Sequence, residues 1–565
     1  MVSVTLCALV FLVGPCLCEH YLQHLSYLRL PATISPQNTY KMFSGTAENA
    51  AYDHQNQILY VVGGTSRLLH MIDISDPFNP TLVHNHQFSS SDGIPLDVAV
   101  CGTEVAVALS SPIKDVYEGH VYFFKTFIPG SSFEYASKIT VGSHPHMLTY
   151  DGSCAELLVA NSGRPGKDAS NVFLDPEGTV ITISRSSAGN AVERFTDFNA
   201  FNTRTDIRLV SENVPRTTWP IKDKVPTVAS DVEPQYIAVT PDNKEAYVVL
   251  QKNSAIARMS IRTGQLTNIY SLPSKDWTDK VMDPSDLDGG IHLRQFPFKS
   301  TLQPSVAKVI GVGSSQYLIT ANEGMTTSFT NSLHGFTWSD NGRASTLKSG
   351  KYSILILPPK NLLFVLVVVC IGSKFDPLYI QNDTFYEYLG TNSKAGRTTV
   401  SSIDGYDLRL AKITVPHHFG GRGFSIFKTN NFGQPVYDSG DTMEKAVAMF
   451  MPNVFNGDCT SNTITTKSPE NEKDSSSDDM GLKLNAMDVV TDNGVTYMLL
   501  GSETVGALFL YTIKTDNTTS GHPEPTMESV YRAGLTDFVW SELYQMEQAG
   551  DAGISNIGFV HLKSF

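Results

Sequence analysis

Residues 231–272 read DVEPQYIAVTPDNKEAYVVLQKNSAIARMSIRTGQLTNIYSL and contain four short runs rich in Val, Ile and Tyr. These residue types favour β-strands. The runs lie at 236–239, 245–250, 256–261 and 266–272, and Asn, Asp, Pro, Lys or Gly residues mark the turns between them. Runs this short and this evenly punctuated predict an antiparallel meander of four strands.

One such sheet cannot bury both of its faces, so similar sheets should recur along the chain. Pro234 opens a landmark in which two variable residues precede an apolar-small-apolar triplet, Ile237-Ala238-Val239. Close or looser copies of this landmark begin at six further positions, which are Ala47, Pro95, Pro145, Pro304, Leu484 and Ile554. Seven sheets around an axis form a β-propeller, in which an all-β chain avoids long exposed edges. The alternative is a pair of β-sandwiches, which show no such period.

We therefore predict an all-β, seven-bladed β-propeller over residues 37–565 with an incomplete last blade. The landmark at Ile554 leaves room for one strand before Phe565. The run Thr39–Gly45 is the expected partner that closes the ring in the same blade, because propellers often pair a strand from one terminus into the last blade. The two middle strands of that blade are expected to be missing.

The fifth blade is split by an insertion of about residues 325–420. Its first two strands are expected to end near Glu323, and its last two to resume at Gly423. Within the insertion, the segment 351–371 contains only ten consecutive apolar residues, about half of what a bilayer requires. We interpret it as a possible translated intron, with a buried strand as the alternative. The stretch 456–480 contains SPENEKDSSSDD, which predicts a mobile acidic loop.

The net charge of −14 argues against nucleic acid as a partner. Residues 1–18 combine an apolar run with small residues before Glu19, which predicts a signal peptide and a secreted protein. Two sequons, at Asn382 and Asn517, predict glycosylation. Cys101 and Cys154 fall in the first turns of neighbouring blades and are a candidate disulfide, with two buried thiols as the alternative.

The candidate metal site is acidic. Asp283, Asp286 and Asp288 lie within six residues, and two glycines that permit tight turning follow them. Calcium prefers six to eight oxygen ligands, which clustered aspartates and turn carbonyls supply. We therefore predict that this stretch contributes to a calcium site.

Three more acids, at blade starts or strand ends, are expected to reach the same face of the propeller: Asp231, Glu233 and Glu323. Arg422 lies between two glycines and is expected to pair with one of the acids in the axial channel. The alternative is that all of these acids cap turns and bind no ion.

The sequence contains no nucleophile elbow, zinc-protease helix, phosphate loop or dinucleotide fingerprint. The histidine pairs His417-His418 and His144/His146 lack the i, i+4 spacing of a helical zinc site. A non-enzymatic role is therefore favoured. The alternative is a metal-dependent propeller hydrolase of phosphatase or lactonase type, because the fold alone cannot separate the two.

Seven motifs in order resemble the choice-of-anchor I propeller proteins, with similarity from about Thr39 to Phe565. They are Asp175-Pro-Glu-Gly-Thr, Asp231-Val-Glu-Pro-Gln-Tyr-Ile-Ala-Val, Asp286-Leu-Asp-Gly-Gly-Ile, Thr320-Ala-Asn-Glu-Gly, Gly421-Arg-Gly-Phe-Ser-Ile, Tyr437-Asp-Ser-Gly-Asp and Gly501-Ser-Glu-Thr-Val-Gly. The resemblance implies a secreted or surface-anchored glycoprotein of biomineralising animals that binds extracellular matrix or a mineral surface.

The chain departs from the family pattern at three blade starts. The acidic steps usual at the last two read Leu484-Asn485-Ala486 and Ile554-Ser555-Asn556, and Ser305 stands where an Asp is usual. A central acidic ring is therefore thinned. No transmembrane span is expected. A lipid-anchor signal does not follow Phe565, and we expect that a truncated C-terminus has lost it.

Overall fold

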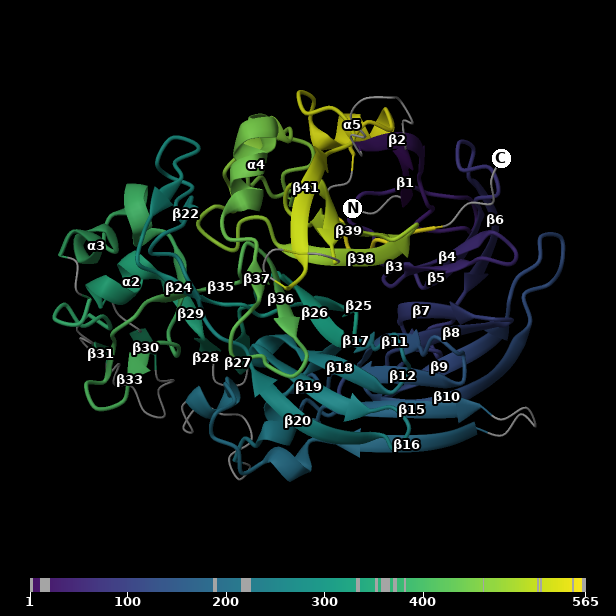
Figure 1. Ribbon diagram of the computed structural model, residues 1–565, viewed down its shortest axis with the longest axis horizontal. Helices are drawn as coiled ribbons and strands as arrows, with labels where there is room; N and C mark the ends of the chain where they lie inside the picture. The colour runs from purple at the N-terminus through teal and green to yellow at the C-terminus, as the bar shows by residue number, and fades with distance from the viewer. Residues whose placement is uncertain are drawn as a thin grey trace.

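The computed structural model describes residues 4–10, 21–185, 191–214, 225–331, 336–350, 354–356, 366–368, 373–380, 383–460, 462–515, 518, 521–550 and 553–560. The chain is all-β, with a few short helices at its periphery (Figure 1). This confirms the predicted all-β class.

Among the described residues, six antiparallel sheets have four strands each. They are β3 (Asn49–Asp53), β4 (Ile58–Gly63), β5 (Leu68–Asp73) and β6 (Thr81–Gln87); β7 (Pro95–Cys101), β8 (Glu104–Leu109), β9 (Glu118–Lys125) and β10 (Tyr135–Ser143); β11 (Pro145–Tyr150), β12 (Glu156–Asn161), β15 (Thr179–Arg185) and β16 (Ala191–Asp197); β17 (Pro234–Val239), β18 (Glu245–Leu250), β19 (Ala255–Ser260) and β20 (Gln265–Ser271); β25 (Val306–Val312), β26 (Ser315–Asn322), β36 (Gly423–Lys428) and β37 (Tyr437–Asp438); and β38 (Leu484–Asp492), β39 (Val495–Ser502), β40 (Leu508–Lys514) and β41 (Glu524–Tyr531).

The first strands of these sheets contact one another in series, in the order β3, β7, β11, β17, β25 and β38. Each begins at or within two residues of a predicted landmark, so the landmark marks the innermost strand of a sheet. The sheets fan out from these strands in Figure 1. Apolar side chains from neighbouring sheets form shared cores, as where Val98 and Val107 pack with Tyr60. The arrangement is therefore propeller-like.

The insertion builds an accessory sheet beside the fifth four-stranded sheet. Its five strands are β21 (Lys275–Asp276), β24 (Lys299–Thr301), β35 (His417–Phe419), β32 (Thr399–Ser401) and β29 (Asn341–Arg343). Two of them belong to the connection before Pro304, and β24 pairs parallel to β35. The helices α2 (Ala344–Ser349) and α3 (Asp383–Tyr388) pack here around buried Trp277, Phe298 and Phe385. The sequence did not predict this pairing.

The expected ring-closing strand at Thr39–Gly45 is wrong. This segment forms only an isolated bridge, between Thr33 and Thr39. The strand β2 (Tyr21–Leu28), which pairs with β1 (Val4–Val10), lies instead between the first and last four-stranded sheets. Leu22 of β2 packs with Leu508 and Ile554. The prediction was wrong because packing with distant residues selects the strand at this position. A short run of residues considered by itself does not show that packing.

The segment 456–480, which we expected to form a mobile acidic loop, is instead packed into the structure. The structure buries polar residues of this segment against the propeller and the accessory sheet: Asn456, Glu472, Asp474, Ser476, Ser477 and Asp478. Arg343 and Arg397, from other segments, pair with Asp478 of this stretch, so composition alone misleads. Of the segment 351–371, only β30 (Ile354–Ile356) and β31 (Leu366–Val368) are described, and they pair with each other. The translated-intron interpretation stays a prediction.

Candidate metal centre

Three aspartates from two distant segments converge below the helix α4 (Thr442–Phe450). Asp283 and Asp288 come from the connection between β20 and β24, and Asp474 comes from the acidic stretch. One carboxylate oxygen from each lies within 4.8 Å of the other two. Among the described residues, this is the sole group of three or more acidic, His or Cys side chains placed to share an ion.

Local backbone turns bring these carboxylates together. Gly289 and Gly290 have φ values of 95° and 132°, a region that side chains rarely adopt, and they follow Asp288 directly. Asp283 is fixed by the backbone N–H of His292, which donates to its Oδ2 at 2.6 Å. The hydroxyl of Ser477 donates to Oδ1 of Asp474 at 2.5 Å. The site is therefore held by turns rather than by one regular element.

The three side chains are almost completely buried. Asp283 is 0 % exposed and Asp474 is 6 % exposed, and the side chain of Asp288 is 2 % exposed. Neither oxygen of Asp288 accepts a hydrogen bond from the described residues. The guanidinium of Arg294 lies 3.4 Å from its Oδ2. Buried carboxylates that their neighbours compensate only in part carry a desolvation penalty, which a proton or a bound cation reduces.

The pKa values of all three carboxyls are raised. Burial raises the pKa of Asp283 to about 7, and the charges of Asp474, Asp288 and Glu444 add to the effect. Burial likewise raises the pKa of Asp474 to about 6, with the charges of Asp288 and Asp286 as further causes. Burial also raises the pKa of Asp288. The cluster has more negative charge than the surrounding protein compensates.

A second polar layer lies beside the cluster. Arg422, fully buried, donates from Nη1 to Oε1 of Glu444 at 2.8 Å and to the carbonyl of Asp283 at 3.0 Å. Glu444 Oε1 also accepts from the amide of Asn456 at 3.0 Å. Glu444 Oε2 and Asn456 Oδ1 are buried and have no hydrogen-bond partner among the described residues. Arg422 thus pairs with an acid, as its position between glycines predicted, but that acid is Glu444.

The other predicted ligands are engaged elsewhere. Asp286 accepts two hydrogen bonds from Arg397, at 2.8 and 3.0 Å. Lys252 lies 2.9 Å from Glu233 and 3.6 Å from Asp231. These ion pairs compensate the charges of Asp286, Glu233 and Asp231, so the three carboxylates are not available to a metal.

Glu323 lies apart from the aspartate cluster. It accepts from Gln251 Nε2 at 3.0 Å, and burial together with the charge of Glu503 raises its pKa to about 7. The predicted convergence of Asp231, Glu233 and Glu323 with the Asp283–Asp288 loop on one axial site is therefore wrong. Lys252 balances the charges of Asp231 and Glu233, whereas Glu323 is bonded to the neutral amide of Gln251.

Sequence reasoning missed Asp474. The sole signal was the acidity of its stretch, which we interpreted as a mobile loop. Its contact with Asp283 depends on how the acidic stretch folds under α4, and no local pattern records it. The histidines His417 and His146 bond to backbone carbonyls, at 2.8 and 2.9 Å, and take no part in the cluster.

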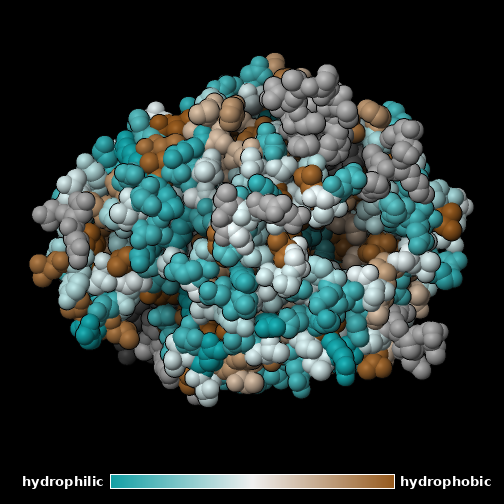
Figure 2. Space-filling model, in the orientation of Figure 1, coloured by the Kyte–Doolittle hydropathy of each residue, from teal (hydrophilic) through white to brown (hydrophobic). Residues whose placement is uncertain are grey.

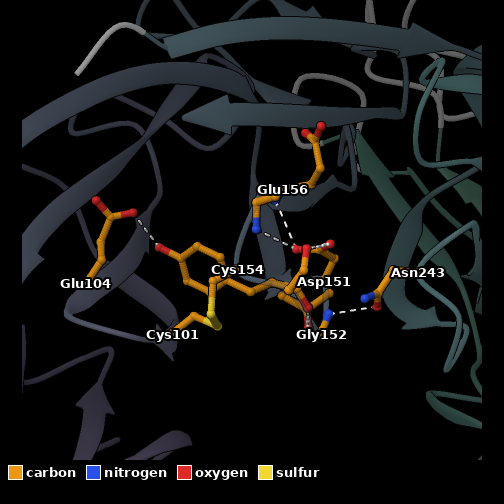
Figure 3. The surroundings of a disulfide bond; sticks show 11 residues. Cys101, Glu104, Asp151, Gly152, Cys154, Glu156 and Asn243 are labelled. Carbon is orange, nitrogen blue, oxygen red and sulfur yellow. Dashed lines mark hydrogen bonds between the residues drawn. A yellow bond between two sulfur atoms is a disulfide. The ribbon is translucent and has the colours of Figure 1, made fainter. Parts of the chain in front are cut away.

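The structure joins Cys101 and Cys154 in a disulfide, with their Cα atoms 5.6 Å apart (Figure 3). Cys101 ends β7 and Cys154 lies in the turn between β11 and β12, so the bond links two neighbouring sheets. Asp151 shapes that turn by accepting from the N–H groups of Ala155 and Glu156, at 2.8 and 3.0 Å. Gly152 N–H donates to the Asn243 side chain of the next sheet at 2.8 Å. The two predicted glycosylation sites, Asn382 and Asn517, lie outside the described residues.

Comparison with known proteins gives two curated relatives. The chain is 24 % identical over 367 residues to the mesenchyme-specific cell surface glycoprotein of Strongylocentrotus purpuratus, covering 63 % of this chain and 44 % of that protein. It is 28 % identical over 166 residues to Gigasin-3a of Magallana gigas, covering 29 % of this chain and 51 % of that protein. The matches thus span about half the length of these relatives.

Among solved structures, the hydrazine synthase of Kuenenia stuttgartiensis aligns over 92 % of this chain and 87 % of that chain, at 10 % identity and a TM-score of 0.38. The profile of the choice-of-anchor I domain, in contrast, matches residues 48–356 and 370–516, with its interruption inside the segment 351–371. Because this match covers well over half of the sequence, the chain belongs to the choice-of-anchor I family.

Proposed function

We propose that this protein is a non-enzymatic, secreted or cell-surface glycoprotein that binds calcium at Asp283, Asp288 and Asp474 and acts in the extracellular matrix of mineral-forming tissue. The observation that carries the proposal is the buried cluster of three carboxylates, whose ligand atoms lie within 4.8 Å of one another. The name of the sea-urchin relative, a mesenchyme-specific cell surface glycoprotein, supports the location.

The donor set favours a hard cation. Its three side chains offer oxygen alone, with no His nitrogen or Cys sulfur in the group. Calcium takes such ligands at about 2.3–2.6 Å in flexible geometry, and it accepts backbone carbonyls and water to complete its shell. The unpartnered oxygens of Glu444 and Asn456 lie in the next layer, where they are able to orient bound water. Calcium is therefore the proposed cofactor.

One feature of the structure, the disulfide, supports an extracellular location. The Cys101–Cys154 disulfide is a bond that persists in oxidising compartments. The face seen in Figure 2 is mostly hydrophilic, with its hydrophobic side chains in small separate patches. None of the described helices has the length and apolar character needed to cross a membrane. The signal peptide at 1–18, glycosylation at Asn382 and Asn517, and a lipid anchor remain parts of this proposal.

We further propose that the ring has seven positions, and that 553–560 forms the innermost segment of the seventh. The hydroxyl of Ser555 donates to the carbonyl of Glu48 at 2.7 Å, which joins this segment to the first sheet. On its other side, the N–H of Phe559 donates to Asp488 of β38 at 2.8 Å. These bonds bridge the gap between the first and last four-stranded sheets.

The alternative function, a metal-dependent hydrolase of phosphatase or lactonase type, requires a cation that is open to substrate. The three carboxylates are at most 6 % exposed, which supports a structural rather than a catalytic ion. Hydrolysis of phosphoester or lactone substrates that depends on Ca²⁺ and is lost in Asp288→Ala would instead support the hydrolase.

Isothermal titration of the full-length protein with Ca²⁺ tests the site. We expect saturable heat with a stoichiometry of about one, and loss of that heat in Asp288→Asn, because the substitution removes a charged ligand without changing its shape. The matched control is Asp279→Asn in the same connection, whose side chain is 78 % exposed, and it should bind like the parent. An absence of heat at millimolar Ca²⁺ would refute the proposal.

A further inference from the structure

The loop 474–479 connects the proposed calcium site to the accessory sheet. Its first residue, Asp474, supplies one of the three carboxylates. Its last three residues, 477–479, receive hydrogen bonds from three arginines that come from other parts of the chain: Arg343, Arg397 and Arg422. A change in the position of this loop therefore affects both the calcium site and the contacts of the arginines.

Arg422 precedes β36 and attaches the loop to the propeller. Its Nη2 donates to the carbonyls of Ser477 and Asp479, at 2.6 and 3.0 Å. The same side chain bonds to the carbonyl of Asp283, which is itself a proposed ligand. The guanidinium thus spans both segments that form the calcium site.

Arg343 and Arg397 attach the loop to the accessory sheet. Arg343, at the end of β29, lies 2.8 Å from Asp478 and 2.9 Å from Asp479. Arg397 lies 2.9 Å from Asp478 and also holds Asp286. The N–H of Thr399 in β32 donates to the carbonyl of Asp478 at 2.7 Å, which adds a backbone bond. The accessory sheet is thus bonded to the same loop that supplies Asp474.

We infer that the cation holds the loop 474–479 in place and thereby fixes the accessory sheet to the propeller. This inference rests on the proposed calcium site. Without the cation, the negative charges of Asp283, Asp288 and Asp474 repel one another in a buried space. Outward movement of the loop relieves that repulsion, and the same movement breaks the bonds to Arg343, Arg397 and Thr399. Calcium occupancy therefore adds to the docking of the accessory sheet, beside the bonds of Lys275 to Asp438 and of Arg208 to Asp404.

Hydrogen–deuterium exchange of the full-length protein, with and without Ca²⁺, measures the coupling. The reporting amides are those of Asp474, which donates to Phe455 at 2.7 Å, and Thr399, which donates to Asp478. We expect calcium to slow the exchange of both amides by at least about tenfold. At a free calcium concentration of one hundred times Kd, ligand binding can slow exchange by at most about a hundredfold. Exchange within β17–β20 should not change, and neither reporter should respond to calcium in Asp288→Asn.

Arg343→Gln gives the reciprocal test. If the attachment of the accessory sheet and calcium binding are coupled, loss of the Arg343 contacts to the loop 474–479 lowers calcium affinity. We expect a loss of about fivefold or more. Simple electrostatics predicts the opposite sign, because removing a positive charge near an acidic site strengthens cation binding. Arg343→Lys keeps the charge but loses the fork of contacts, and it should also weaken binding. The matched control is Arg194→Gln, a similarly exposed arginine paired with Glu156 in another sheet, which should bind normally.

The outcomes separate the inference from the proposed function. Absence of calcium binding in the parent protein refutes both. Binding that is lost in Asp288→Asn, together with unchanged exchange at Thr399 and an unchanged or higher affinity in Arg343→Gln, overturns the coupling and leaves the site intact. Slower exchange at Thr399 and weaker binding in both Arg343 variants support it.

Discussion

At the scale of single residues, burial decides which acids are satisfied. Asp97 in β7 is 6 % exposed, and its Oδ2 accepts from the N–H of Leu148 in the next sheet at 2.8 Å. Burial raises the pKa of Asp97 to about 7. No cation among the described residues compensates it in the way that Lys252 compensates Glu233 and Asp231. The carboxyl of Asp97 therefore contributes differently to stability at different pH values.

The first prediction concerns Asp97→Asn. Because the folded pKa lies above the unfolded value, the native protein binds this proton more tightly, and the resulting stability is present below about pH 4 and is lost as pH rises through about 7. Asparagine keeps the acceptor for Leu148 without the charge. At pH 8 we expect the free energy of unfolding of the variant to exceed that of the parent by up to about 4 kcal/mol. Its unfolding temperature should therefore be higher. Thermal unfolding at pH 5 and pH 8 measures this, and a variant that is less stable at pH 8 would refute it.

The second prediction concerns Lys252, which is 1 % exposed between two buried acids. Lys252→Met leaves Glu233 and Asp231 without their cation, so we expect a loss of about 3–5 kcal/mol in the free energy of unfolding. The matched control is Lys244→Met, which breaks an exposed pair with Asp242 and should change stability by less than about 1 kcal/mol. Urea unfolding of both variants gives the comparison. Equal losses of stability in the two variants would show that burial of Lys252 with Glu233 and Asp231 does not increase the cost of removing the lysine.

At the scale of elements, the sequence predicts the innermost strands well. Pro95, Pro145 and Pro234 each open a strand, because proline suits the first residue of a strand and the following alternation is local. The split of the fifth sheet between Glu323 and Gly423 follows from the same pattern. The accessory sheet was not predicted, since its strands have two or three residues, and β24 pairs with β35 across more than one hundred residues of sequence.

The candidate site was predicted only in part. Asp283 and Asp288 were found because they lie close in sequence next to two glycines. Asp286 stands between them yet pairs with Arg397, because alternate residues of a turn face different neighbours. Asp474 was not found, because the sequence shows that its stretch is acidic but does not show which distant residues lie beside it. The error at Thr39–Gly45 has the same origin, since long-range packing selects the strand that fills a position.

The third prediction concerns the disulfide between the second and third sheets. Its half-cystines lie 53 residues apart, and removing the bond frees a long loop in the unfolded chain. We expect the double variant Cys101→Ser, Cys154→Ser to lose about 2–4 kcal/mol in the free energy of unfolding. Denaturant unfolding measures this, with reduced parent protein as the control. A reduced parent that is as stable as the oxidised protein would contradict the expectation.

At the scale of the whole molecule, the propeller-like ring and the accessory sheet meet at one buried acidic region. Asp283, Asp288 and Asp474 lie where the connection, the acidic stretch and α4 come together. Arg422, Arg343 and Arg397 surround this region and offset part of its charge. The remaining negative charge is what a divalent cation would neutralise.

The fourth prediction follows from this arrangement. Calcium should raise the unfolding temperature of the full-length protein, because a ligand that binds the folded state alone stabilises it, by about 2.7 kcal/mol at one hundred times Kd. Asp288→Asn should abolish the calcium-dependent part, whereas Asp279→Asn should retain it. Differential scanning calorimetry with and without a chelator measures the effect, and an equal response in both variants would be inconsistent with the site.

The most direct test is the anomalous scattering of crystals grown with Tb³⁺ as a calcium substitute. We expect a strong anomalous peak bounded by the carboxylates of Asp283, Asp288 and Asp474. A map with no peak there, while these three carboxylates lie as described, would show that the aspartates bind no cation.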